Sequence, residues 1–156
     1  MHALELWLLR VERSFVSHKL ISNRIGAMTT TVSRGNVLII EDHPDCGSLL
    51  RQLIGSSGYT ARWVQTRDAA VNMMRAKQFD SIILDVAMPG MTIEEFFRKC
   101  HPPLDRVILI SAVVDSGKVA ERLGVRHWIR KPFNPDQILE LLNSLNPAPK
   151  NAPAEA

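Results

Sequence analysis

Residues 37–45 read VLIIEDHPD, a short apolar run followed at once by two acidic residues. A near-continuous run of Val, Leu and Ile is typical of a strand that is covered on both faces, as in a parallel sheet. The residues that follow, 44–56, have the apolar spacing of a helix. The stretch therefore predicts a buried strand that leads into a helix.

The same alternation continues along the chain to residue 145. We expect strands at 37–40, 59–64, 81–84, 107–110 and 125–129, and helices at 44–56, 67–77, 93–100, 118–123 and 135–145. Five β–α units in succession imply a doubly wound α/β domain. Its sheet should be five-stranded and parallel, with helices on both faces and right-handed crossovers.

Several helix boundaries carry chemical signals of their own. Asn134 can cap the last helix, Pro135 suits its first position, and Gln137 lies at the third position of a capping box. Gly58 and Gly124 lie where the first and fourth helices should end, as glycines often do. These signals agree with the boundaries that the apolar pattern predicts.

Length and composition are those of one globular domain. The chain has 156 residues, of which 46% are hydrophobic and 22% charged. It contains no run of about eighteen apolar residues, so no membrane-spanning helix is expected. Cys46 and Cys100 are too few for a disulfide framework, which favours free thiols in a reducing, cytoplasmic setting.

Three regions differ in composition: an N-terminal extension at 1–34, a folded domain at 35–145 and a tail at 146–156. The tail is rich in Pro and Ala and is predicted to be disordered. The extension has two interpretations. It is either an amphipathic helix with Leu4, Leu8, Val11 and Phe15 on one face, or a segment without fixed structure upstream of a natural start at Met28.

The charge distribution bears on nucleic-acid binding. Five basic and two acidic residues within 1–34 account for the net charge of +3, and the remaining 14 basic and 14 acidic side chains cancel. A protein that binds a phosphate backbone should concentrate Lys and Arg on its folded surface. Direct DNA binding by the folded domain is therefore not expected.

Polar side chains gather at the predicted carboxyl ends of the strands. Glu41 and Asp42 follow the first strand, Asp85 the third, Ser111 the fourth and Lys131 the fifth. In an open parallel sheet these ends meet at one edge, where such folds bind their ligands. A solvated loop would account for each residue alone, but their combination predicts a phosphate-and-metal site.

The chemistry of this set is specific. A carboxylate can attack a phosphoryl group and form an acyl phosphate. Neighbouring carboxylates repel one another, and Mg²⁺ offsets that charge because it prefers oxygen ligands. A lysine and a hydroxyl can in turn hold the phosphoryl oxygens.

Four stretches in order resemble the receiver domain of two-component response regulators, as in the chemotaxis regulators. They are VLIIEDHPD (37–45), IILDVAMPGM (82–91), VILISA (107–112) and RKPF (130–133). Together they span about residues 37–145. The resemblance implies the flavodoxin-like strand order 2-1-3-4-5.

The resemblance also implies roles for individual residues. Asp85 corresponds to the phosphoacceptor, Ser111 to the switch hydroxyl and Lys131 to the lysine that pairs with the phosphoryl group. Trp128 occupies the position of the aromatic switch, where a plain buried Trp that packs the sheet edge is the alternative. The bond between Lys131 and Pro132 is expected to be cis.

The same resemblance implies Mg²⁺ as the cofactor. Asp42 corresponds to a direct ligand, with Glu41 acting largely through water. Asp85 itself and the backbone carbonyl of Ala87 complete the expected metal site.

The leading hypothesis is a stand-alone receiver that is a phosphoacceptor rather than an enzyme. Self-phosphorylation from small donors and autodephosphorylation are expected to depend on Mg²⁺. A histidine kinase or a histidine phosphotransfer protein would supply the phosphoryl group, and the output would be contact with an unknown downstream protein. The alternative is a receiver-like interaction module that works without phosphorylation. A flavodoxin-like cofactor enzyme ranks last, because acids after the first strand would repel a cofactor phosphate.

Overall fold

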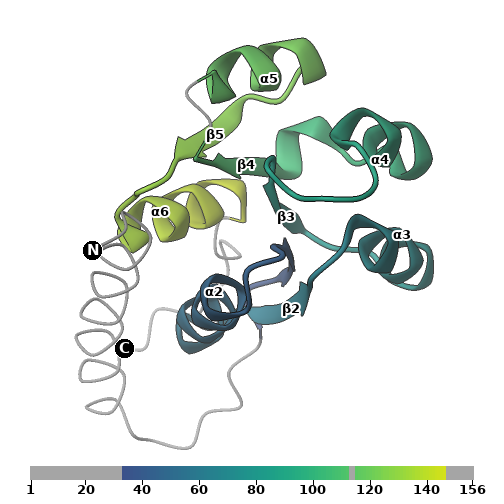
Figure 1. Ribbon diagram of the computed structural model, residues 1–156. Helices are drawn as coiled ribbons and strands as arrows, with labels where there is room; N and C mark the ends of the chain where they lie inside the picture. Colours follow the sequence, from purple (N-terminus) through teal and green to yellow (C-terminus); the bar gives the residue numbers. More distant parts are fainter. Residues whose placement is uncertain (1–32, 113–114, 147–156) are drawn as a thin grey trace, which may run out of the picture.

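The computed structural model describes residues 33–112 and 115–146. Five strands form one parallel sheet in the order β2-β1-β3-β4-β5 (Figure 1). The strands are β1 (Asn36–Ile40), β2 (Thr60–Val64), β3 (Ser81–Asp85), β4 (Val107–Ser111) and β5 (His127–Arg130). The predicted fold class and strand order are confirmed.

Helices cover both faces of the sheet (Figure 1). α2 (Pro44–Ser56) and α6 (Pro135–Leu145) pack on one face. The other face carries α3 (Arg67–Ala76), α4 (Ile93–Cys100) and α5 (Ser116–Leu123). A short 3-10 turn, η1 (Leu104–Arg106), precedes β4.

The middle residues of the central strands are apolar because both faces of the sheet are covered. In β1, Val37 and Ile39 belong to the core beneath α2 and α6, whereas Leu38 and Ile40 belong to the core beneath the other three helices. All four side chains are fully buried. This alternation follows from the two-residue period of a strand, so an unbroken apolar run supplies two cores at once.

β3 and β4 each end one residue later than the sequence predicts, and these two last residues belong to the candidate site. Asp85 pairs in register with Ile110 across β3 and β4, and Ser111 pairs with Arg130 across β4 and β5. Both side chains are therefore carried by the sheet itself rather than by the loops that follow it.

The predicted strand at 125–129 begins two residues too early. Gly124 adopts a left-handed conformation with φ 71°, and the backbone N–H of Val125 donates to the carbonyl of Ala120. Val125 therefore belongs to the turn that ends α5, because its N–H satisfies an unpaired helix carbonyl. The preceding helix also begins two residues earlier than predicted, at Ser116.

Other local predictions are confirmed. Asn134 and Gln137 form the capping box of α6, and Pro135 is its first residue. The bond between Lys131 and Pro132 is cis. Among the described residues, no helix combines the length and the apolar character that crossing a membrane requires. The extension at 1–34 and the tail at 146–156 lie almost entirely outside the described residues.

Candidate functional site

The predicted site residues lie at the carboxyl ends of four adjacent strands. Glu41 and Asp42 follow β1, Asp85 ends β3, Ser111 ends β4 and Lys131 follows β5. These strands are neighbours in the sheet order, with parallel pairing throughout. One edge of the sheet therefore collects residues that are 90 positions apart in sequence.

Three carboxylates form the centre of this edge. Glu41, Asp42 and Asp85 each offer an oxygen atom within 4.8 Å of the others. Glu41 and Asp85 are buried, with 1% and 5% of their surfaces exposed, whereas Asp42 is open to solvent. The cluster thus combines two buried carboxylates, Glu41 and Asp85, with the accessible carboxylate of Asp42.

Lys131 joins the two buried acids. Its Nζ atom donates to Oε2 of Glu41 and to Oδ2 of Asp85, both at 2.7 Å. Burial by itself would lower the pKa of Lys131, yet the pKa is raised because the carboxylates of Glu41 and Asp85 lie beside the ammonium. A fixed positive charge therefore lies beside the Asp85 carboxylate.

Glu41 is held from several directions. Its Oε1 atom accepts the backbone N–H of His43 at 3.2 Å, and its Oε2 atom accepts the thiol of Cys46 at 3.2 Å. The indole N–H of Trp63 donates to its backbone carbonyl at 2.9 Å. Burial raises the pKa of Glu41; Lys131 opposes this rise and Asp85 adds to it. A nearby cation would therefore favour the ionised carboxylate.

Hydrogen bonds to backbone groups hold Asp85 and Ser111 at the carboxyl edge of the sheet. The Oδ1 atom of Asp85 accepts the N–H of Ala87 at 2.8 Å, which fixes the start of the loop between β3 and α4. The backbone N–H of Lys131 donates to the carbonyl of Ser111 at 2.8 Å, and Ser111 is 1% exposed. The structure thus brings Asp85, Ala87, Ser111 and Lys131 to one place.

Trp128 is the predicted residue that lies outside this group. It belongs to the edge strand β5 and is 44% exposed. Its indole lies against Gly117 of α5, where an added Cβ would be 3.1 Å from Cζ2. Trp128 is therefore not the fully buried side chain that the alternative supposed, although its indole packs against α5, and its role as a switch stays a prediction.

Three further residues contact the site and were missed by the sequence analysis: Cys46, Trp63 and Arg67. Arg67 is 2% exposed and donates four hydrogen bonds to backbone carbonyls between residues 85 and 91. Its one signal in the sequence is its position in the first turn of α3, where a positive charge opposes the helix dipole. Cys46 and Trp63 carry no such signal.

The oxygen atoms of the cluster fit Mg²⁺, which binds through one or two carboxylates together with water and phosphate oxygens. Glu41, Asp42 and Asp85 would hold the cation, and the accessible Asp42 leaves room for water and for a phosphoryl group. Lys131 adds a second positive charge on the buried side of Asp85. The arrangement can therefore neutralise phosphoryl oxygens next to a carboxylate nucleophile.

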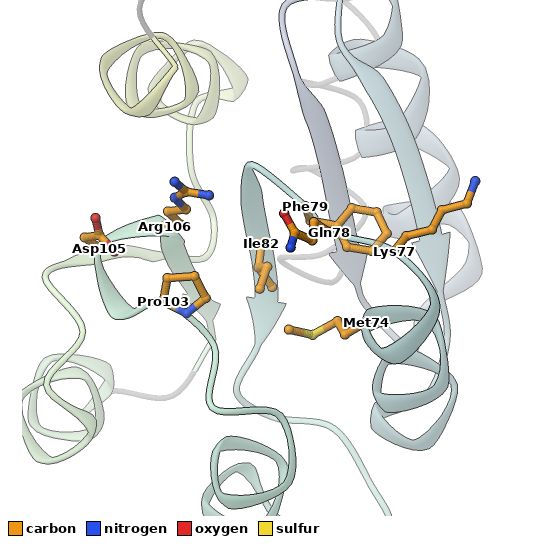
Figure 2. Close-up of a pocket in the computed structure, with 8 residues that line it drawn as sticks. All are labelled: Met74, Lys77, Gln78, Phe79, Ile82, Pro103, Asp105 and Arg106. Atoms are coloured by element: carbon orange, nitrogen blue, oxygen red, sulfur yellow. The ribbon is translucent and has the colours of Figure 1, made fainter.

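A cavity of about 420 Å³ lies at the opposite end of the sheet, beside the starts of β3 and β4. Met74, Phe79, Ile82 and Pro103 form much of its wall (Figure 2). Lys77 lies on one side of this cavity, and Asp105 and Arg106 lie on the other (Figure 2). The cluster of Glu41, Asp42 and Asp85 and this cavity are therefore at different ends of the domain.

Comparison with known proteins agrees with the geometry. Residues 37–143 match the response regulator receiver domain family. The transcriptional activator protein IrlR of Burkholderia pseudomallei is 30% identical over 114 residues, which are 70% of this chain and 49% of that protein. The nitrogen assimilation regulatory protein NtrX of Azorhizobium caulinodans is 27% identical over 111 residues, 67% of this chain and 24% of that protein. The chain thus spans half or less of the length of these relatives.

Solved structures show the same fold. A response regulator receiver protein from Burkholderia phymatum is 29% identical, with a TM-score of 0.62 over 70% of this chain and 93% of that chain. The chemotaxis protein CheY4 of Vibrio cholerae is 24% identical, with a TM-score of 0.60 over 70% of this chain and 97% of that chain.

Proposed function

The chain belongs to the response regulator receiver domain family, and on that premise we propose that Asp85 is its phosphoacceptor. A receiver domain is a phosphoacceptor signalling module rather than a conventional enzyme, and it takes its phosphoryl group from a kinase or phosphotransfer partner. For this chain we propose a histidine kinase or a histidine phosphotransfer protein as the donor.

The observation that carries this proposal is the pair of 2.7 Å hydrogen bonds from Lys131 to Glu41 and Asp85. An oxygen atom of the Asp85 carboxylate attacks the phosphorus of a phosphohistidine. The P–N bond breaks, and the imidazole leaves as its nitrogen takes the electron pair of that bond and a proton from water. Lys131 stays beside the product and pairs with a phosphoryl oxygen.

Mg²⁺ supplies charge neutralisation between the carboxylates and the incoming phosphoryl group. Asp42 and Asp85 would hold the cation directly, Glu41 would act largely through water, and the carbonyl of Ala87 would complete the set. Ser111 turns its hydroxyl toward the phosphoryl oxygens. These roles rest on the family resemblance, and the clustering of the three acids supports them.

The output is proposed to be contact with a downstream protein, within the cytoplasm. IrlR is a transcriptional activator protein and NtrX a nitrogen assimilation regulatory protein, and this chain spans half or less of each, so their activities are not assigned to this domain. Stand-alone operation of residues 35–145 and the absence of direct DNA binding by this domain stay predictions.

The test is phosphorylation by a small phosphodonor in the presence of Mg²⁺, followed by intact mass spectrometry. We expect one phosphoryl adduct that alkali and hydroxylamine remove, as an acyl phosphate requires. Asp85→Asn should abolish it completely. An adduct that persists in this variant would refute the assignment, and no adduct in the native chain would favour an interaction module that works without phosphorylation.

A further inference from the structure

Arg67 makes an unusual set of contacts for a buried arginine. One terminal nitrogen donates to the carbonyls of Asp85 and Val86, at 3.0 and 2.8 Å. The other donates to the carbonyls of Met88 and Met91, at 3.1 and 2.6 Å. A guanidinium that is 2% exposed thus binds four neutral backbone acceptors on one loop.

The four acceptors flank one particular residue. Arg67 binds carbonyls on both sides of Ala87, at positions 85 and 86 before it and at 88 and 91 after it. The N–H of Ala87 donates to the carboxylate of Asp85. Hydrogen bonds therefore hold the loop between β3 and α4 on both sides of Ala87. The proposed metal site requires the backbone carbonyl of this residue.

Burying a charged group is costly unless hydrogen bonds satisfy it. Only arginine offers five donors in a planar fork, which is what four carbonyls along a curved loop require. Lys131 already places one positive charge beside Asp85. The three carboxylates and Lys131 still leave a net charge of −2, which a second cation reduces. Charge alone does not explain why the hydrogen bonds of Arg67 all go to backbone carbonyls of residues 85–91 rather than to the carboxylates.

We propose that Arg67 is a positioning residue that holds the β3–α4 loop in the arrangement that the metal site needs, before any cation binds. This inference rests on the proposed function of Asp85 and its neighbours. A loop that is held in advance binds its ligand more tightly, because the apparent dissociation constant is the intrinsic one divided by the competent fraction.

The sign of one measurement separates this role from a simple charge effect. Arg67 lies close enough to Asp85 and Asp42 to interact with their charges. A positive charge near a cation site opposes Mg²⁺, so its removal alone would strengthen Mg²⁺ binding. Loss of a positioning residue would weaken Mg²⁺ binding instead.

The experiment compares Arg67→Met and Arg67→Lys with the native chain, and uses Arg75→Met as the control because Arg75 is exposed on the same helix. Calorimetry measures the Mg²⁺ dissociation constant, and amide hydrogen exchange measures the protection of residues 86–91 without metal. We expect Arg67→Met to weaken Mg²⁺ binding about tenfold or more and to speed exchange in the loop, which Mg²⁺ should then slow. Arg75→Met should match the native chain.

Arg67→Lys keeps the charge but offers fewer donors, so its Mg²⁺ affinity should lie between the two. If Arg67→Met does not fold, Arg67→Lys provides the test of Mg²⁺ binding and loop exchange. Unchanged or tighter Mg²⁺ binding in either folded variant, or unchanged exchange in the loop, would overturn the proposal. A native chain that binds no Mg²⁺ would refute the proposed function, whereas the exchange measurement without metal would still report on the loop.

Discussion

At the carboxyl end of the sheet, ionisable side chains bind one another, whereas at the amino end the carboxylate of Asp80 binds the backbone. Lys131 donates to Glu41 and Asp85 at the first end. At the second end, the carboxylate of Asp80 accepts the backbone N–H of Asn36 at 2.7 Å. The backbone N–H of Asp80 in turn donates to the carbonyl of Asn36 at 2.8 Å. The cavity of about 420 Å³ also lies at this second end.

The difference shows that reactive chemistry and empty volume need not coincide in this fold. An acid such as Asp80 that accepts one backbone N–H completes the start of a strand. Three acids that face one another and a buried lysine have no such structural need, because their mutual repulsion must be offset. Function is therefore expected where charges converge.

The largest expected effect is on metal binding. Asp42→Ala removes the accessible carboxylate of the cluster and should weaken Mg²⁺ binding by about 100-fold or more, as measured by calorimetry. Asp80→Ala is the control at the other end. It should reduce the free energy of unfolding by about 1 kcal/mol through a lost hydrogen bond while Mg²⁺ affinity stays unchanged. If both variants lost the same Mg²⁺ affinity, metal binding would not be specific to the carboxyl end of the sheet.

Two glycines on α2 test packing at the two ends. A Cβ at Gly47 would overlap the indole of Trp63, which is also bonded to Glu41, so Gly47→Ala should lower the free energy of unfolding by about 3 kcal/mol. A Cβ at Gly55 would meet nothing within 4 Å, so Gly55→Ala should raise the free energy of unfolding by about 0.5 kcal/mol. Urea denaturation measures both, and a neutral Gly47→Ala would show that Trp63 moves freely.

Lys131→Met should lower the free energy of unfolding by about 2 kcal/mol at neutral pH without metal, because two buried carboxylates lose their shared cation. Burial and the neighbouring charge of Asp85 then raise the folded-state pKa of Glu41 without opposition from Lys131. The folded state therefore binds protons more readily, and the deficit should shrink as the pH falls. Urea denaturation across a pH series tests this, with the exposed Lys77→Met as an inert control. A deficit that grows on acidification would contradict the ion-pair explanation.

The smallest expected effect concerns Trp128. Beryllofluoride with Mg²⁺ mimics the phosphoryl group, and inward movement of a side chain that is 44% exposed should shift its emission slightly to shorter wavelength. Trp128→Phe removes this signal and leaves Trp7 and Trp63, whose emission change is subtracted from that of the native chain. If beryllofluoride is bound at Asp85 and the emission of Trp128 does not change, the output surface does not include Trp128. The conformational change would then be limited to the carboxyl end of the sheet.

The amino-acid sequence by itself determined the fold class and most of the site. Apolar runs such as 37–40 and 107–110 specify strands buried on both faces, and a parallel sheet brings the carboxyl ends of its strands to one edge. Glu41, Asp42, Asp85 and Lys131 could therefore be grouped from their positions along the chain. The strand order was implied by the family resemblance rather than by these runs.

The tertiary structure alone decided the contacts that cross between elements. Arg67 reaches carbonyls 18 to 24 residues away, and Trp63 reaches Glu41 across 22 residues. No periodicity encodes such contacts, because they depend on how α3 and β2 lie against neighbouring loops. The exposure of Trp128 has the same origin, since β5 is an edge strand that α5 covers only in part. Local patterns specify elements, whereas burial and hydrogen-bond partners follow from what packs against them.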